Sequence, residues 1–285
     1  MRKLLKYEMR ALNRRLFPLY AGVLAMAVLN YFFGIRSIVV TVAKDQPLDG
    51  FLYTNEYVRL LYGVFQTCII ALFFGLIVAM FVIWLLTVIN RFRKGLLGEE
   101  GYLMFTLPVS TDRLIGAKML GASIHLLLAS VVSCLAICIM IGVPDICRLI
   151  LGVSWGEVFA ELNRAMPSWP LVIVEMIVIG VVTTFASVLQ FYLAMALGHL
   201  SNSHRTLLSV LAYIGIAIAL NMISGMLMIP LSIDNFSDFL WQIASQNIRA
   251  SVHIFMLIVF VFSLIECVVM WFGTRYILKN KLNLE

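Results

Sequence analysis

Apolar residues gather along this chain in six long stretches that charged residues hardly interrupt. A helix that crosses the ~30 Å hydrocarbon layer of a membrane needs about 20 such residues, and each stretch provides them. The stretches are continuous, whereas the strands of a membrane β-barrel alternate apolar and polar positions over about ten residues. The pattern therefore predicts six transmembrane helices, at residues 17–35, 60–90, 114–142, 170–198, 206–230 and 252–275.

Residues 2–16 follow a different pattern, with two opposite faces at helical spacing. One face carries Lys3, Lys6, Arg10 and Arg14, and the other carries Leu5, Met9, Leu12 and Leu16. Such a helix lies in the membrane interface with its basic face toward anionic headgroups. Pro18 suits the first turn of a new helix, so we expect a bend before the first span. Two alternatives are a basic anchor that only fixes topology and a cleaved signal peptide, whose apolar run is usually shorter, about 7–15 residues.

The composition agrees with a chain that lies mostly in lipid. Apolar residues make up 62% of the chain and charged residues 13%, whereas a soluble domain has about 45–50% and about 25%. These values exclude an ordinary soluble enzyme and an intrinsically disordered chain.

The positive charges predict the orientation. Fifteen of the 21 Lys and Arg residues fall on one side of the predicted spans, and this side includes both termini. Cytoplasmic loops carry the excess of Lys and Arg, so both termini are expected in the cytoplasm. The sequence thus predicts an all-α integral membrane protein, with an amphipathic interfacial helix at residues 1–16 and a six-helix transmembrane domain at residues 17–285.

The cytoplasmic loop at residues 91–113 is the most informative segment between spans. Its glycines at 95, 98 and 101 permit sharp turns, and Pro108 ends any helix before it. Ser110 or Thr111 is expected to cap the third span, with Asp112 in its first turn. A short element at residues 99–107 then exposes aromatic and aliphatic side chains beside charges, which suggests a docking surface for another protein.

This segment resembles a known family. GEEGYLMFTLPVS at residues 98–110 is similar to the cytoplasmic loop of the bacterial ABC transporter permeases of the type-two exporter class, in which an acidic pair precedes Gly-Tyr-Leu and then Thr-Leu-Pro-Val-Ser. FYLAMALGHLSNSHR at residues 191–205 resembles the segment between the fourth and fifth spans of that family.

The resemblance implies a permease subunit of an ATP-driven exporter in a bacterial cell membrane. Such a permease forms a homodimer or heterodimer, binds ATPase subunits on its cytoplasmic side and moves its substrate outward. The coupling residues carried over to this chain are Glu99, Glu100, Gly101, Tyr102, Phe105 and Pro108. Residues 199–205 are expected to make a smaller contact.

The chain itself carries no phosphate-binding loop, because the required Gly-Lys pair occurs nowhere in it. We therefore expect a non-catalytic subunit without cofactors, whose separate ATPase partner binds ATP and magnesium. Membrane lipid is an expected partner and nucleic acid is not. The apolar spans favour an amphiphilic substrate, such as a peptide, an antibiotic or a lipid-like compound.

Polar residues inside spans are candidate sites because their burial in lipid is costly. Glu266, Gln190 and His125 have similar expected depths in the inner half, which suggests a polar cluster on a substrate or proton path; a structural hydrogen bond is the alternative. Glu175 lies close to Trp169 and is expected to reach outward. The cysteines inside spans, Cys134 and Cys138 among them, are expected to pack as small apolar residues.

Two other function classes stay open from the sequence. An ion-coupled secondary transporter or channel would usually show inverted repeats or interrupted helices, and neither is clear here. An intramembrane serine protease would need a Gly-x-Ser-Gly motif, but Met222 stands where the first glycine should be, and His253 lies at the outer end of its span. A His-Glu-x-x-His zinc motif is absent from the sequence.

Overall fold

The chain is described by a computed structural model that covers residues 2–35, 56–98, 101, 109–142, 152, 154–165, 168–201, 204–228 and 248–281. The described residues form helices joined by turns, without a β-strand. Six of these helices are long and apolar enough to cross a membrane, which confirms the number of spans predicted from the apolar stretches.

The six long helices extend a few residues beyond the predicted apolar limits at most of their ends. They are α1 (Arg2–Asn30), α3 (Glu56–Phe92), α5 (Thr111–Ile141), α8 (Trp169–Gly198), α9 (Arg205–Met228) and α11 (Ile248–Asn280). Two π-helical turns continue α1 and α3, namely η1 (Tyr31–Ile35) and η2 (Arg93–Leu97). A shorter helix, α7 (Trp155–Ala165), precedes α8.

The helical backbone of α1 continues through Pro18. The basic segment at residues 2–16 and the first span therefore belong to one helix. A proline inside a helix removes one backbone hydrogen bond and its ring crowds the preceding turn, which favours a kink. The bend at Pro18, the interfacial position of the first segment and the cytoplasmic location of the termini stay predictions.

The chain divides into two compact units. One comprises Tyr7–Thr87 and Ile124–Ser154, and we call it the α1 unit; the other comprises Met1–Lys6, Val88–Ser123 and Trp155–Glu285, and we call it the α8 unit. The helices α3 and α5 contribute to both.

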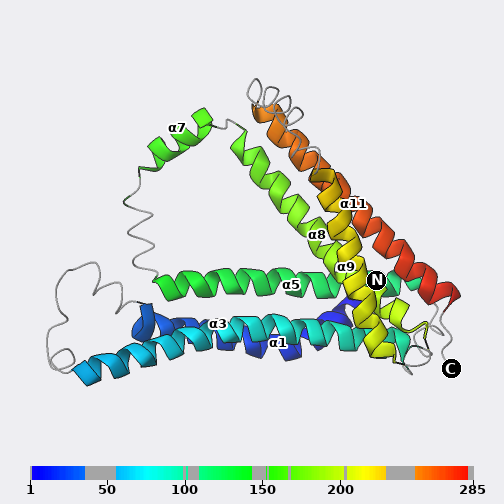
Figure 1. Cartoon of the computed structure of the whole chain (residues 1–285), viewed down its shortest axis with the longest axis horizontal. Helices are drawn as coiled ribbons and strands as arrows, with labels where there is room; N and C mark the ends of the chain where they lie inside the picture. Colours follow the sequence, from blue (N-terminus) through cyan, green and yellow to red (C-terminus); the bar gives the residue numbers. More distant parts are fainter. Residues whose placement is uncertain are drawn as a thin grey trace. The chain divides into compact units, whose positions relative to one another are not determined.

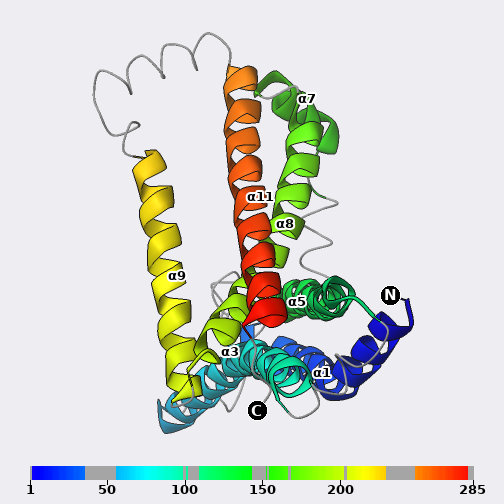
Figure 2. The same cartoon turned by 90° about the vertical axis from the view of Figure 1, so that its right-hand side faces the viewer.

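In the α1 unit, α1, α3 and α5 lie side by side (Figures 1 and 2). Buried polar side chains join them. The Asn30 side chain, fully buried, donates to the carbonyl of Ile69 on α3 at 3.2 Å. The Tyr20 hydroxyl, also buried, donates to the carbonyl of His125 on α5 at 3.1 Å. Such interhelical hydrogen bonds help hold helices together where there is no water to drive apolar association.

In the α8 unit, α8 packs along α11 and meets α9 (Figure 2). The buried side chains of α8 all lie in its second half, from Ala186 onward. There Tyr192 stacks on Phe92 of α3, with ring centroids 4.1 Å apart, and Phe191 stacks on Tyr213 of α9 at 4.8 Å. The carboxyl-terminal half of α8 is therefore the packed centre of this unit.

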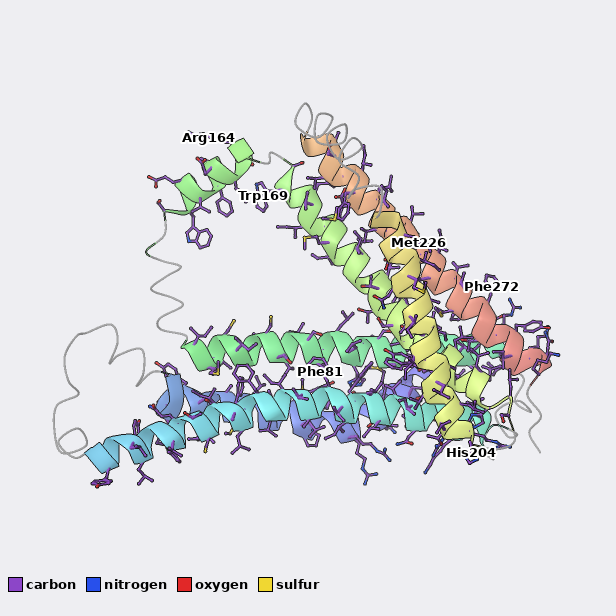
Figure 3. The ribbon with its side chains drawn as sticks, in the orientation of Figure 1. Phe81, Arg164, Trp169, His204, Met226 and Phe272 are labelled. Atoms are coloured by element: carbon purple, nitrogen blue, oxygen red, sulfur yellow. The ribbon has the colours of Figure 1, made fainter. Side chains whose placement is uncertain are left out.

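The short helix α7 lies beside the start of α8, where Figure 3 labels Arg164 and Trp169. The Trp169 indole stacks on Phe159 and donates to the Asn163 side chain at 3.0 Å. The sequence predicts short amphipathic helices at the outer surface for residues 155–166 and 233–248. The first helix is confirmed, and its outer location stays a prediction. The second lies outside the described residues, apart from Ile248 at the start of α11.

Candidate functional site

The predicted coupling residues are only partly described. Gly101 is described and buried. Glu99, Glu100, Tyr102, Phe105 and Pro108 lie outside the described residues, so their role stays a prediction. What the structure does show is how the two ends of this segment join the α8 unit.

The segment leaves α3 through the π-helical turn η2. Leu96 and Leu97 are buried, and the chain then becomes extended at Gly98. The amide of Gly101 donates back to the carbonyl of Gly98 at 2.8 Å. A Cβ atom at Gly101 would lie 2.7 Å from the carbonyl oxygen of Leu96, which no side chain tolerates. The glycine at 101 is therefore required by the close approach of two backbone segments, and π-helical turns such as η2 are frequent at functional sites.

Lys118 of α5 contacts the end of α3, where the segment begins. Its side chain is 7% exposed, and its ammonium donates to the carbonyl of Arg91 at 3.4 Å. The last carbonyls of a helix lack intrahelical partners and favour a positive charge nearby. Lys118 thus ties the end of α3 to the start of α5. In the sequence, Lys118 counts only among the positive charges that predict the orientation, although a cation two turns inside an apolar helix was a hint of such a role.

The other end of the segment enters α5, which begins at Thr111 directly after Ser110. The amides of Arg113 and Leu114 donate to the carbonyl of Ser110, and Asp112 lies in the first turn as predicted. Asp112 Oδ1 also lies 3.1 Å from Nε of Arg275 on α11, an ion pair without hydrogen-bond geometry. Both ends of the segment are therefore attached to neighbouring helices of the same unit.

The turn between α8 and α9 borders the same region. A Cβ atom at Gly198 would lie 2.5 Å from the amide nitrogen of Ser209, so α8 and α9 touch through their backbones. His204, labelled in Figure 3, adopts a left-handed φ of 56° immediately before α9. Histidine is among the few side chains that adopt this conformation at modest cost.

A cavity of about 300 Å³ lies between η2 and this turn. Its charged and titratable lining residues are Arg93, Lys94, His199 and Arg205, and the others are Leu97, Gly98 and Thr206. Burial lowers the pKa of the His199 imidazole below its usual 6.5. A hydrogen bond from its Nδ1 to the Met195 carbonyl, at 3.2 Å, opposes this shift, whereas the charges of Arg205 and Arg93 add to it.

The predicted polar cluster divides between the two units. His125 belongs to the α1 unit, and Glu266 and Gln190 belong to the α8 unit. His125 is fully buried, and its Nδ1 lies 3.3 Å from the Tyr20 hydroxyl. Glu266 and Gln190 are half-buried, and no hydrogen bond or ion pair joins them within the described part of the chain. Their joint role stays a prediction.

The α8 unit contains a further ionisable pair between spans, which the sequence did not predict. The Glu175 carboxylate on α8 bonds to Nδ1 of His253 on α11, with both of its oxygens at 2.9 Å. Both residues line a cavity of about 200 Å³ whose other walls are apolar. The sequence predicted only that Glu175 reaches outward. The signal that could have indicated this pair is depth: Glu175 and His253 both lie near the predicted outer ends of their spans.

The serine of the near-match to the protease motif, Ser224, makes a hydrogen bond within its own helix. Ser224 Oγ donates to the carbonyl of Asn221 in its own helix at 3.1 Å. The described residues also contain no group of three or more His, Cys, Asp and Glu side chains that could hold a metal ion.

Comparison with known proteins adds no assignment. Family models, curated proteins and solved structures were all searched, and none of them matches this chain.

Proposed function

We propose that this chain is the membrane-spanning permease subunit of an ATP-driven ABC exporter. A separate ATPase binds and hydrolyses ATP with magnesium and acts on the permease through residues 99–108. The permease works as a dimer in a bacterial cell membrane, with both termini in the cytoplasm, and moves an amphiphilic substrate outward. The family resemblance of residues 98–110 is the source of this assignment.

One structural observation supports the proposal. The segment that resembles the coupling loop is attached at both ends to helices of one compact unit, through the Gly101–Leu96 approach and the Asp112–Arg275 ion pair. Packed interiors have low compressibility and transmit displacements. A force applied at Gly101 or Asp112 would therefore act directly on α3, α5 and α11.

The proposal is tested by purification. We expect a soluble protein with a phosphate-binding loop, encoded beside this chain, to purify with it and to show ATPase activity. Tyr102→Ala and Glu100→Arg should separate the two proteins or uncouple ATP turnover from transport. Tyr276→Ala on α11 and Glu161→Arg on α7 are the matched controls, because both side chains are exposed and lie outside the segment. A purified single chain that transports under an ion gradient without ATP would instead identify a secondary transporter or channel.

A further inference from the structure

The cavity between η2 and the α8–α9 turn has the chemistry of an anion site. Three of its lining side chains, Arg93, Lys94 and Arg205, carry permanent positive charge, and no carboxylate lines it among the described residues. None of these three side chains makes an ion pair or a hydrogen bond with the described part of the protein. Among the described residues, their positive charge is therefore not neutralised by another side chain.

The three cations act on a common space. Arg93 and Arg205 come from segments that are distant in sequence, yet both line the cavity together with His199, and the charges of both lower the pKa of this imidazole. Like charges brought together repel one another unless an anion joins them. Burial of the neighbouring Leu96 and Leu97 and the backbone contact of Gly198 with Ser209 hold this arrangement in place.

The position of the cavity at the ends of the spans indicates which kind of anion would fit it. The apolar spans end at Leu97 on one side of the cavity and at Gly198 and Arg205 on the other. These ends mark the boundary between hydrocarbon and water, where the phosphate groups of lipids lie. Basic pockets between transmembrane helices on the cytoplasmic side are typical binding sites for anionic headgroups.

We propose that Arg93, Lys94 and Arg205 form a site for a phosphate group, and that its occupant is the headgroup of an anionic phospholipid. The guanidinium groups of Arg93 and Arg205 bind the phosphate oxygens, for which their planar geometry is suited. Thr206 contributes its hydroxyl at the start of α9. The acyl chains of the lipid extend along the apolar surface of the neighbouring spans.

The test uses the full-length protein in detergent, stripped of lipid and then titrated with phosphatidylglycerol, phosphatidylcholine or inorganic phosphate. Native mass spectrometry counts bound lipid, and thermal unfolding reports its effect on stability. We expect phosphatidylglycerol to bind and to raise the Tm, and the other two to do neither. Equal effects of phosphatidylglycerol and phosphatidylcholine would overturn the proposal, and an equal effect of inorganic phosphate would assign the site to a free anion instead.

A pair of double variants tests the location of the site. Arg93→Gln with Arg205→Gln should weaken phosphatidylglycerol binding about thirtyfold, since each cation near the surface contributes a factor of about five. Lys279→Gln with Lys281→Gln removes the same charge from exposed positions at the end of α11 and should change binding by less than about threefold.

An equal loss of phosphatidylglycerol affinity in both double variants would show that binding depends only on the overall positive charge, and would overturn the proposed site. Unchanged binding in the Arg93 and Arg205 variant would overturn it as well. If lipid fails to bind the wild-type protein but a co-purified acidic protein protects these two arginines from chemical modification, the cavity is a protein-docking surface and the lipid assignment is wrong.

Discussion

His253 and Glu175 form a hydrogen-bonded pair between α11 and α8, with Nδ1 of the imidazole 2.9 Å from each carboxylate oxygen. The two residues are 78 positions apart in the sequence. Both side chains are about three-quarters buried. A polar pair in this position joins two spans whose remaining contact is mainly apolar.

We expect this pair to contribute measurably to the packing of α8 against α11. A double-mutant cycle of Glu175→Gln and His253→Ala should give a coupling free energy of about 1 kcal/mol, the upper part of the range found for hydrogen bonds between membrane helices. The free energy of unfolding is measured in mixed detergent micelles. Glu161→Gln on α7, which breaks a largely exposed ion pair with Arg164, is the control and should change it by less than about 0.5 kcal/mol. A coupling energy near zero would show that the pair does not stabilise the interface.

Tyr20→Phe should destabilise the α1 unit by about 1 kcal/mol. The Tyr20 hydroxyl donates to the His125 carbonyl, so Nδ1 of His125 donates to the same hydroxyl oxygen. Nε2 of the neutral ring already has no hydrogen-bond partner among the described residues, and the variant would leave Nδ1 without one as well. Tyr7→Phe, at a residue that is 67% exposed, is the matched control. A Tyr20 variant as stable as this control would contradict the role of the pair.

Gly198→Ala should separate the ends of α8 and α9. Its Cβ atom would lie 2.5 Å from the Ser209 amide nitrogen and 2.7 Å from the Ser209 Cα, both backbone atoms that cannot rotate away. Overpacking of this kind costs about 1–3 kcal/mol in the free energy of unfolding. Gly180→Ala on the same helix is the control, because its Cβ atom would meet nothing within 4 Å. Alanine favours the helix there, so equal or greater stability is expected. Equal destabilisation by both changes would refute the close approach.

Acidification should destabilise the region around His199. Because burial lowers the pKa of this imidazole in the folded protein, the unfolded chain takes up the proton first as the pH falls. The contribution to stability is therefore complete above the usual pKa of 6.5 and decreases as the pH falls below it toward the folded pKa. The free energy of unfolding of the wild-type protein should fall more between pH 7.5 and pH 5.5 than that of His199→Asn. If the free energy of unfolding of the two proteins changed equally with pH, the lowered pKa of His199 would be contradicted.

Loss of the Asp112–Arg275 ion pair should affect ATP turnover of the proposed complex more than the free energy of unfolding of this chain. Both side chains are more than a third exposed, so Asp112→Asn should change the free energy of unfolding by only about 0.5 kcal/mol. If the proposed function is correct, the same change should reduce substrate-stimulated ATP turnover of the purified complex, because it loosens the attachment of the segment to α11. Glu161→Gln again serves as the control, and it should leave that turnover unchanged. Equal ATP turnover in the Asp112 variant and the wild type would remove this contact from the coupling path.

The sequence by itself determined the membrane class of this protein and predicted the six helices of the described residues that are long and apolar enough to cross a membrane. Hydropathy is a local property: a run of apolar residues as long as residues 60–90 requires a helix in lipid, whatever its neighbours are. Local chemistry also predicted the start of α5 after Ser110 and the short helix before Trp169. The proline at 18 predicted a separate helix, whereas the structure has one continuous helix there, because a proline weakens one turn without ending a helix whose other bonds persist.

Only the tertiary structure decided which polar residues meet. Tyr20 is 105 positions from His125, and Glu175 is 78 positions from His253, so no local spacing pairs them. Each residue is costly alone at its depth in the membrane, and the sequence shows that cost. The partner that relieves it depends on which helix faces are turned toward each other, and this rotation is set by close packing of many apolar side chains, not by any one residue.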